Sequence, residues 1–278
     1  MKYTPKQAPE GINTSTEHPL KELVLLLGST LAIILGLIYF VIISTDYLVK
    51  YIPVSVENEI FNNKFTNFSA PSAIQELQKQ EEYLNDLVES LQVAGEIESH
   101  KFKVHIIVNQ APNAFAYPGG NIGVTTGLLK LLDSENGLAM VLGHEIGHHL
   151  ARDPIKGIGR GVIIGIFVYT VLGIGSDEWI QGLIGELTMA SLMSFSRDQE
   201  RAADQIGKNL IFQHYGHTRG ASEFFEKINS TENKFIDSIN YLNSHPSTEE
   251  RILSLKNSMD DNKELKPLPD FLVRDSRS

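Results

Sequence analysis

The chain has 278 residues, a formal net charge of −10 and no cysteine. The length allows one or two domains with a sizeable core, and the acidic balance argues against nucleic acid as a partner. Because cysteine is absent, disulfides and thiolate metal sites are excluded, and any metal ligands must be His, Asp or Glu.

A long uncharged segment near the N-terminus predicts a membrane anchor. Residues 1–22 are polar and predict a flexible tail, whereas the residues from Leu23 to Ile43 carry no charge. A bilayer-spanning helix needs about 20 apolar residues, while the apolar core of a cleaved signal peptide is shorter and is followed by small residues. We therefore predict an uncleaved transmembrane signal anchor at residues 23–44, which makes the lipid bilayer a partner.

The positive charges beside this anchor set its expected orientation. The lysines before the segment are Lys2, Lys6 and Lys21, and those after it are Lys50 and Lys64. Positive residues close to a span favour the cytoplasmic side, and Lys21 lies at the membrane edge. We expect a single-pass protein of a bacterial inner-type membrane, with a cytoplasmic N-terminus and the main domain on the periplasmic or extracytoplasmic side.

Residues 45–258 predict a mostly helical α+β domain. The β-rich segment at 102–108 predicts a strand, and Pro118-Gly119-Gly120 predicts a turn. Helical patterns begin after Pro71-Ser72 and cover 128–132, 134–152, 196–213, 221–228, 235–242 and 249–255. Asp153-Pro154 should stop the helix at 134–152, because the residue before proline avoids helical geometry. The polar residues 259–278 predict a loose C-terminal tail.

An apolar insertion at residues 157–195 allows two interpretations. It could form a second membrane hairpin, but Asp177, Glu178 and Glu186 make that costly. A metal site built from residues on both sides of the insertion permits either zero or two crossings between them. We favour a hydrophobic flap or helical pair that packs near the site or dips into the bilayer surface.

The residues most indicative of chemistry lie in the helix predicted at 134–152. His144 and His148 are four residues apart, so one helix face can direct both imidazoles at one metal ion. Glu145 lies beside them, where its carboxylate could take a proton from water at the metal. His-Glu-x-x-His inside an apolar helix is the arrangement of a zinc peptidase.

The helix predicted at 196–213 offers the missing ligand. Zinc held by two histidines needs a third protein ligand and an open position for water. Glu200 and Asp204 share one face of this helix. Glu200 can complete a His2Glu set, and Asp204 can hold the free ring nitrogen of a ligating histidine. Taken alone, the same residues with Arg197 and Arg201 would predict a salt-bridged surface helix.

Together, His144-Glu-Ile-Gly-His148 and Glu200-Arg-Ala-Ala-Asp204 resemble the M48 family of zinc metallopeptidases. The segment at 113–128 and the pair of His245-Pro246-Ser247 and Arg251-Ile252 agree with this family. The single-anchor layout looks closest to its Oma1-like members. The resemblance implies a zincin domain of the gluzincin type with a small β-sheet and one Zn²⁺ per subunit. Asp153 departs from the pattern, since many relatives place a histidine there, but it lies outside the ligand set.

The resemblance also implies a mechanism, in which zinc-activated water hydrolyses a peptide bond and Glu145 is the general base. It implies further that the segment at 113–124 supplies an edge strand, to which a peptide adds by main-chain hydrogen bonds. The residues expected there are Asn113, Ala114, Phe115, Gly120, Ile122 and Val124. Such recognition suits peptides of unfolded or membrane proteins as substrates.

His245 and Arg251 have open roles. His245 could donate to an oxyanion, bind zinc as a fourth ligand in a latent state, or cap a helix. Arg251 could stabilise charge during the reaction or form a buried salt bridge. His149 is expected to be structural, and no motif supports a role for His100, His105, His214 and His217.

The sequence as a whole predicts a membrane-anchored, zinc-dependent endopeptidase that acts on misfolded, membrane or envelope proteins in quality control. One alternative is a non-proteolytic chaperone or adaptor at the membrane, against which Glu145 argues, because a purely structural metal site needs no such carboxylate. The other is a CAAX-type processing protease, if the insertion at 157–195 places the site within the membrane.

Overall fold

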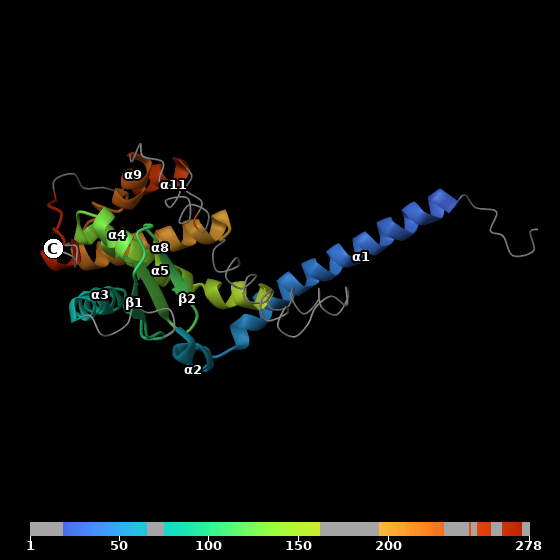
Figure 1. Ribbon diagram of the computed structural model, residues 1–278, viewed down its shortest axis with the longest axis horizontal. Coiled ribbons are helices and arrows are strands. Elements are labelled where there is room, and N and C mark those ends of the chain that lie inside the picture. The colour runs from blue at the N-terminus through green and yellow to red at the C-terminus, as the bar shows by residue number, and fades with distance from the viewer. Residues whose placement is uncertain are drawn as a thin grey trace, which may run out of the picture. The chain divides into compact units, whose positions relative to one another are not determined.

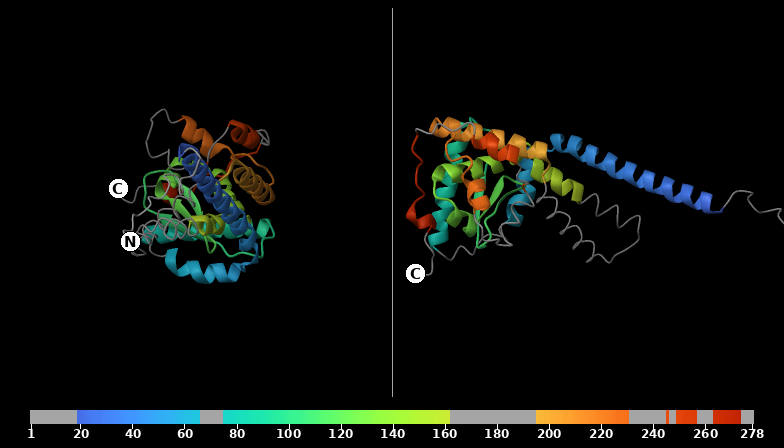
Figure 2. Two further views of the ribbon diagram at one scale, coloured as in Figure 1. Left: turned by 90° about the vertical axis from the view of Figure 1, so that its right-hand side faces the viewer. Right: turned by 90° about the horizontal axis from the view of Figure 1, so that it is seen from above.

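The structure is a computed structural model that describes residues 19–65, 75–161, 195–230, 245, 249–256 and 263–273 (Figures 1 and 2). The chain divides into two compact units, Met1–Ser44 and Thr45–Ser278. Three predicted features lie outside the described residues: the tail at 1–18, the insertion from 162 to 194, and the helix at 235–242.

Helix α1 (Pro19–Leu48) is long and apolar, and most of its side chains are exposed. Its course continues through a short 3-10 turn, Val49–Tyr51. Among the described residues, the stretch Pro19–Tyr51 is the one helix long and apolar enough to cross a membrane, and its most apolar part is not buried. The helix predicted at 23–44 therefore lies inside α1.

A three-stranded sheet forms beside the helices, in the order β1-β3-β2. Strand β1 (Lys103–Ile107) runs parallel to β3 (Asn121–Thr125), and β2 (Ala114–Tyr117) runs antiparallel to it. The predicted turn joins β2 to β3, with Gly120 at φ +76°, where an added Cβ would lie 2.0 Å from the Lys101 carbonyl oxygen. Glycine is required there because an L side chain would have neither the space nor the conformation.

This strand order corrects the expectation of one edge strand at 113–124. Of the two strands in this segment, β2 lies at an edge of the sheet, and it contacts helix α5 (Glu135–Leu150). Ile122 and Val124 belong to the central strand, which is paired on both sides. Their backbone groups are already used in the sheet, so within this segment the unpaired strand edge lies along Ala114 and Phe115 and not along these two residues.

Helices α5 and α8 (Arg197–Tyr215) pack closely against each other (Figure 1). A Cβ added at Gly147 would lie 2.8 Å from the Ala203 Cα, and a Cβ added at Gly143 would lie 3.0 Å from the Gly207 Cα. Glycines on α5 thus let the two backbones approach. Gly143 and Gly147 both face α8, so side chains of α8 come within reach of those on α5.

The remaining helices enclose this pair and the sheet. Helix α3 (Gln75–Ala94) packs on β1 and α8 and buries Leu84 and Leu91 completely. The shorter elements are α2 (Val54–Phe65), α4 (Thr126–Leu131), α9 (Glu223–Ser230) and α11 (Glu249–Lys256). The core consists of apolar side chains from α3, the sheet, α4, α5, α8 and α9.

Helix α5 ends before Asp153-Pro154, within two residues of the predicted end, but the chain becomes helical again directly afterwards. The helix ends at Leu150 with Ala151 as its C-cap, and Arg152 adopts a left-handed φ of +61°. Residues 153–161 are helical again. Asp153-Pro154 therefore follows the end of α5, as predicted, and also begins a new helix, because proline is readily accommodated in the first turn of a helix.

The C-terminal residues 263–273 are packed, so the predicted loose tail is wrong for this part. The Lys266 carbonyl oxygen accepts a hydrogen bond from the Glu135 backbone N–H at 2.7 Å, and the Phe271 carbonyl oxygen accepts one from the Gln80 side chain at 2.6 Å. Leu272, in the short helix α12 (Asp270–Val273), is 2% exposed and joins the main core. The segment ties the start of α5 to α3.

Candidate metal centre

Helix α5 presents two histidines and a glutamate in a buried environment. Ser134 caps its N-terminus by accepting a hydrogen bond from the Gly137 N–H. His144 and His148 lie one turn apart on α5, and their Nε2 atoms are 3.1 Å from each other. Both side chains and that of Glu145 are buried. The motif thus directs two imidazoles at one point.

Helix α8 brings two carboxylates to the same point. Its N-terminus has a capping box formed by Ser196 and Gln199. Glu200 lies 3.5 Å from the Nε2 atom of each α5 histidine. Asp204, one turn later, lies 2.9 Å from the Nδ1 atom of His144. The two residues occupy the places that the sequence proposes for a third ligand and for a support of a ligating ring.

His245 contributes a fourth nitrogen, although it is far away in the sequence. Its Nδ1 atom lies 3.0 Å from Glu200 Oε1 and 3.3 Å from His144 Nε2. Its Nε2 atom is 3.8 Å from Glu145 Oε1. One ligand atom from each of His144, His148, Glu200 and His245 falls within a common span of 4.8 Å. Of the roles that the sequence leaves open for His245, this position agrees with a fourth ligand.

The hydrogen bonds of the α5 histidines test whether the donor set fits a metal ion. Asp204 and Asp153 accept at the Nδ1 atoms of His144 and His148, respectively. A carboxylate is an acceptor only, so Nδ1 carries the proton and the Nε2 atom of each neutral ring has a free lone pair. Two lone pairs and the Glu200 oxygens therefore converge on one point. Such an arrangement needs a proton or a metal ion between the donors, so the residues fit a metal ion.

The electrostatics of these residues agree with a site for positive charge. Burial alone would lower the pKa of His148, but hydrogen bonds with Asp153 and Glu200 outweigh it and raise the pKa to about 9. Burial would raise the pKa of Glu200, but its hydrogen bonds with His148 and His245 hold it well below the ordinary value. The donor set is thus rich in negative charge and attracts a proton or a metal ion.

Glu145 differs from the other carboxylates of the site. Both of its carboxylate oxygens are buried and lack a hydrogen-bond partner among the described residues. Burial raises the pKa of Glu145 above that of an ordinary glutamate. A buried acceptor without a partner, next to a metal-binding cluster, is suited to taking up a proton.

Arg251 is engaged by the two carboxylates of α8. Its Nη1 atom lies 2.6 Å from Glu200 Oε2, and its Nε atom donates to Asp204 at 2.6 Å. Burial would raise the pKa of Asp204, but hydrogen bonds from Arg251 and His144 lower it to about 2. Of the two roles that the sequence allows for Arg251, these contacts support the buried salt bridge. This salt bridge holds the carboxylates of Glu200 and Asp204 in place.

Two residues in contact with His148 have no role in the sequence prediction. Asp153 Oδ2 lies 3.1 Å from His148 Nδ1. The Phe195 ring stacks on the imidazole of His148, with a centroid distance of 3.9 Å and an angle of 19°. The sequence shows that Asp153 differs from the family pattern, but its contact with His148 depends on the left-handed conformation of Arg152. Nothing in the sequence singles out Phe195.

The other histidines occupy positions outside the metal cluster. His149 bonds the Asn121 carbonyl oxygen through Nε2 at 3.0 Å, and burial lowers its pKa to about 3. It therefore stays neutral and links α5 to β3. His105 lies 3.1 Å from the Asn121 side chain, and His100 stacks on Phe102. These contacts are structural.

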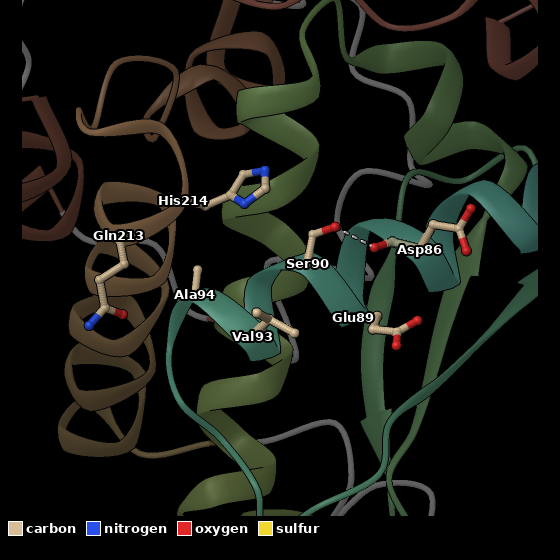
Figure 3. A pocket seen from close by; sticks show the side chains of 7 residues that line it. All are labelled: Asp86, Glu89, Ser90, Val93, Ala94, Gln213 and His214. Atoms are coloured by element: carbon tan, nitrogen blue, oxygen red, sulfur yellow. Dashed lines mark hydrogen bonds between the residues drawn. The ribbon is translucent and has the colours of Figure 1, made fainter.

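A separate groove lies on the surface between α3 and α8 (Figure 3). Its volume is about 570 Å³. Its lining residues are Asp86, Glu89, Ser90, Val93, Ala94, Gln213 and His214. Ser90 donates a hydrogen bond to the Asp86 backbone oxygen, as the dashed line in Figure 3 marks. None of the residues of the metal cluster contributes to this groove.

The sequence also matches a known protein family. The profile of peptidase family M48 matches residues 78–259, which is more than half of the chain. The chain therefore belongs to peptidase family M48, a family of metallopeptidases, and this confirms the resemblance carried by the motifs on α5 and α8.

Relatives in this family occur in mitochondria and in bacteria. The mitochondrial metalloendopeptidase OMA1 of Schizosaccharomyces pombe is 28% identical over 176 residues, covering 63% of this chain and 51% of the relative. OMA1 of Arabidopsis thaliana is 30% identical over 170 residues, 59% of this chain and 33% of the relative. The beta-barrel assembly-enhancing protease of Yersinia pestis is 28% identical over 197 residues, 68% and 40% respectively. The chain thus spans about half, or less, of the length of these relatives.

Proposed function

We propose that this chain is a membrane-anchored zinc endopeptidase that cleaves misfolded, membrane or envelope proteins. The observation that carries the proposal is the convergence of His144, His148 and Glu200 on one point, with the unpartnered carboxylate of Glu145 beside it. A structural metal site has no need of a free buried carboxylate, whereas hydrolysis requires a base.

The spacing of the donor atoms supports zinc as the metal. Zinc binds His nitrogen and carboxylate oxygen at about 2.0–2.2 Å in tetrahedral geometry, so its ligand atoms lie about 3.3 Å apart. Five distances among the donors of His144, His148, Glu200 and His245 are 3.0 to 3.5 Å, with Glu200 using Oε2 toward His144 and Oε1 toward the other two, and one atom from each residue lies within 4.8 Å of the rest. One zinc ion per subunit agrees with this set, which is the one such group among the described residues. When bound, zinc polarises the scissile carbonyl and makes water more acidic.

The residues of the chain would perform the remaining steps. Glu145 takes the proton of the attacking water, which its raised pKa favours, and then delivers this proton to the leaving amine. Strand β2 lies at the sheet edge and contacts α5. An extended peptide can add beside Ala114 and Phe115 by main-chain hydrogen bonds, with little dependence on its side chains. This mode of binding suits unfolded chains.

The membrane location is supported by α1 and by the relatives. The apolar surface of α1 is exposed over its length, which suits contact with lipid. Lys21 and the lysines before it favour a cytoplasmic N-terminus, with the catalytic unit on the periplasmic or extracytoplasmic side. The names of the relatives include a mitochondrial metalloendopeptidase and a protease that enhances β-barrel assembly. Both names suit action near a membrane.

His245 would make the described arrangement a closed state. Its Nδ1 atom lies among the donors, where catalysis needs an open position. We expect His245→Ala to weaken metal binding and to raise the rate of peptide hydrolysis, because it frees this position for water. A loss of hydrolysis of about 10²-fold or more would instead identify His245 as an oxyanion donor.

The decisive experiment is Glu145→Gln in the full chain, prepared in detergent or lipid. Metal content and hydrolysis of a quenched, unstructured peptide are measured with the metal-loaded protein, alone and in the His245→Ala background. Glu145→Gln should retain the metal and lower the rate by about 10²-fold or more. Glu89→Gln on the exposed face of α3 is the matched control and should have no effect.

Two outcomes would contradict the proposal. Hydrolysis that survives Glu145→Gln would remove Glu145 as the base. A wild-type chain that binds zinc but cleaves no peptide, even with His245→Ala, would favour the non-proteolytic adaptor. A CAAX-type processing protease would cleave only near the lipidated C-terminus of its substrate, and cleavage of an unmodified internal sequence counts against it.

A further inference from the structure

The buried carboxylate of Asp153 contacts one of the two histidines on α5, at the side away from the donor cluster. Its Oδ2 atom lies 3.1 Å from His148 Nδ1, and both side chains are almost completely buried. We propose that Asp153 is a positioning residue of the metal centre, which holds the His148 ring through Nδ1 and presents Nε2 to the metal. This inference rests on the metal site of the proposed function.

The local backbone explains how Asp153 reaches this place. On an uninterrupted α-helix a residue five positions along is turned by about 140° from the first, so Asp153 would face away from His148. Helix α5 ends at Leu150, however, and Arg152 takes a left-handed φ of +61°. This turn interrupts the helix, and the helix at 153–161 begins with Asp153 beside the ring. A non-glycine residue in this conformation is uncommon and costs free energy.

The contact matches the one at the other α5 histidine. Asp204 Oδ1 lies 2.9 Å from His144 Nδ1, so each ring has a carboxylate at Nδ1. The two carboxylates come from different elements and are balanced by different cations. Asp204 pairs with Arg251, whereas Asp153 has Lys156 at 3.4 Å. Both rings have a carboxylate at Nδ1, although the two carboxylates come from different parts of the chain. This indicates a common requirement of the rings and not a chance contact.

The requirement is a defined tautomer and a fixed ring. A carboxylate at Nδ1 keeps the proton there and leaves the lone pair on Nε2, and it makes the imidazole a stronger donor to a metal. His148 is held at its edge by Asp153 and on its face by Phe195. Removing such a partner lowers metal affinity by about 10- to 100-fold in comparable sites.

A simpler role for Asp153 is to begin the helix at 153–161 and to pair with Lys156. The two roles predict different effects of substituting Asp153. A helix-start role affects the stability of the chain whether or not His148 is present. A positioning role affects metal affinity and disappears when the His148 imidazole is removed.

The experiment measures Zn²⁺ affinity of the full chain by competition with a chromophoric chelator, and thermal unfolding of the metal-free chain. Asp153→Asn should weaken zinc binding by about 10- to 100-fold, and Asp153→Glu should recover part of this loss. In the His148→Ala background, Asp153→Asn should cause no further loss. Lys156→Gln, and Asp198→Asn on the exposed start of α8, should change the affinity less than twofold.

The results separate the possible failures. A wild-type chain that takes up no zinc overturns both this inference and the proposed function. Zinc uptake by wild type, with unchanged affinity in Asp153→Asn, overturns the positioning role alone. An equal loss in the presence and absence of the His148 imidazole also overturns it, because the loss would then reflect the fold. If Asp153→Asn does not fold, Asp153→Glu and its pairing with His148→Ala decide the matter.

Discussion

Helices α1 and α5 are both apolar, but their surroundings are opposite. Helix α1 exposes its large side chains, with Leu25 at 60% and Ile33 at 63% exposed. In α5 every residue from Glu135 to His149 is buried. Composition therefore does not decide which helix forms the core. The difference lies in the charged residues and histidines, which are absent from Leu23 to Ile43 of α1 and numerous in α5.

Each polar side chain at the metal centre on α5, apart from Glu145, has a partner that offsets the cost of burial. His144 and His148 contact Asp204 and Asp153, and His149 bonds a backbone carbonyl. From Leu23 to Ile43, helix α1 has no charged residue or histidine that would need such a partner, and Ser29 donates to the Leu26 carbonyl oxygen of its own helix. The comparison teaches that an apolar helix with paired polar groups predicts a functional core, whereas one without them predicts contact with lipid.

The largest expected effect comes from placing a charge in the buried helix. Leu142 on α5 is completely buried in the main core, so Leu142→Arg would leave a cation without a partner. We expect it to lower the free energy of unfolding by more than about 4 kcal/mol, and so to prevent stable folding. Urea unfolding followed by circular dichroism measures this, and a near-normal midpoint would contradict the packing of α5.

The same substitution on α1 should act on the membrane instead. Leu35 is 57% exposed, and Leu35→Arg places a charge near the middle of the predicted span. It should disfavour membrane insertion by about 2.5–3.5 kcal/mol, without changing the urea midpoint of the catalytic unit. An insertion assay measures the first quantity. Unchanged insertion together with a lower midpoint would indicate that α1 packs against protein and not lipid.

Much of the donor set was predictable because its parts are local. The i, i+4 spacing on α5 and on α8 places His144 with His148, and Glu200 with Asp204, before any tertiary structure is known. The metal also requires both pairs to meet, which determines that α5 and α8 are neighbours. His245 and Arg251 were recognisable as candidates, but their roles depend on distances that no sequence pattern contains.

The features that the sequence does not predict depend on tertiary contacts or on unusual backbone. The contact of Asp153 needs the left-handed Arg152, which no residue preference indicates. The strand order places β3 in the centre, although β2 and β3 look equally exposed in the pattern. The C-terminal segment looks loose because it is polar and contains prolines, yet Leu268 and Leu272 anchor it in the core.

The segment that follows α1 meets Arg152, just after α5, through the Ile52 carbonyl oxygen and through the buried carboxylate of Glu57. Glu57 on α2 lies 2.9 Å from Arg152 and accepts a hydrogen bond from the Gly119 N–H at 3.0 Å. Glu57→Gln removes the charge that Arg152 needs and should lower the free energy of unfolding by about 1.5–3 kcal/mol. Glu59→Gln, at an exposed position of the same helix, is the control. Equal urea midpoints for the two variants would contradict a structural role of this contact.

The smallest effect distinguishes the two helices by their glycines. An added Cβ at Gly147 would lie 2.8 Å from the Ala203 Cα, whereas at Gly36 on α1 it would meet no atom within 4 Å. Overpacking costs about 1–3 kcal/mol, while replacing a helical glycine with alanine gains about 1 kcal/mol. Gly147→Ala should therefore lower the free energy of unfolding by up to about 2 kcal/mol, and Gly36→Ala should not lower it. Because the backbone shift also moves α8, Gly147→Ala should weaken zinc binding as well. An affinity equal to that of wild type would show that the donor atoms tolerate a wider spacing of α5 and α8.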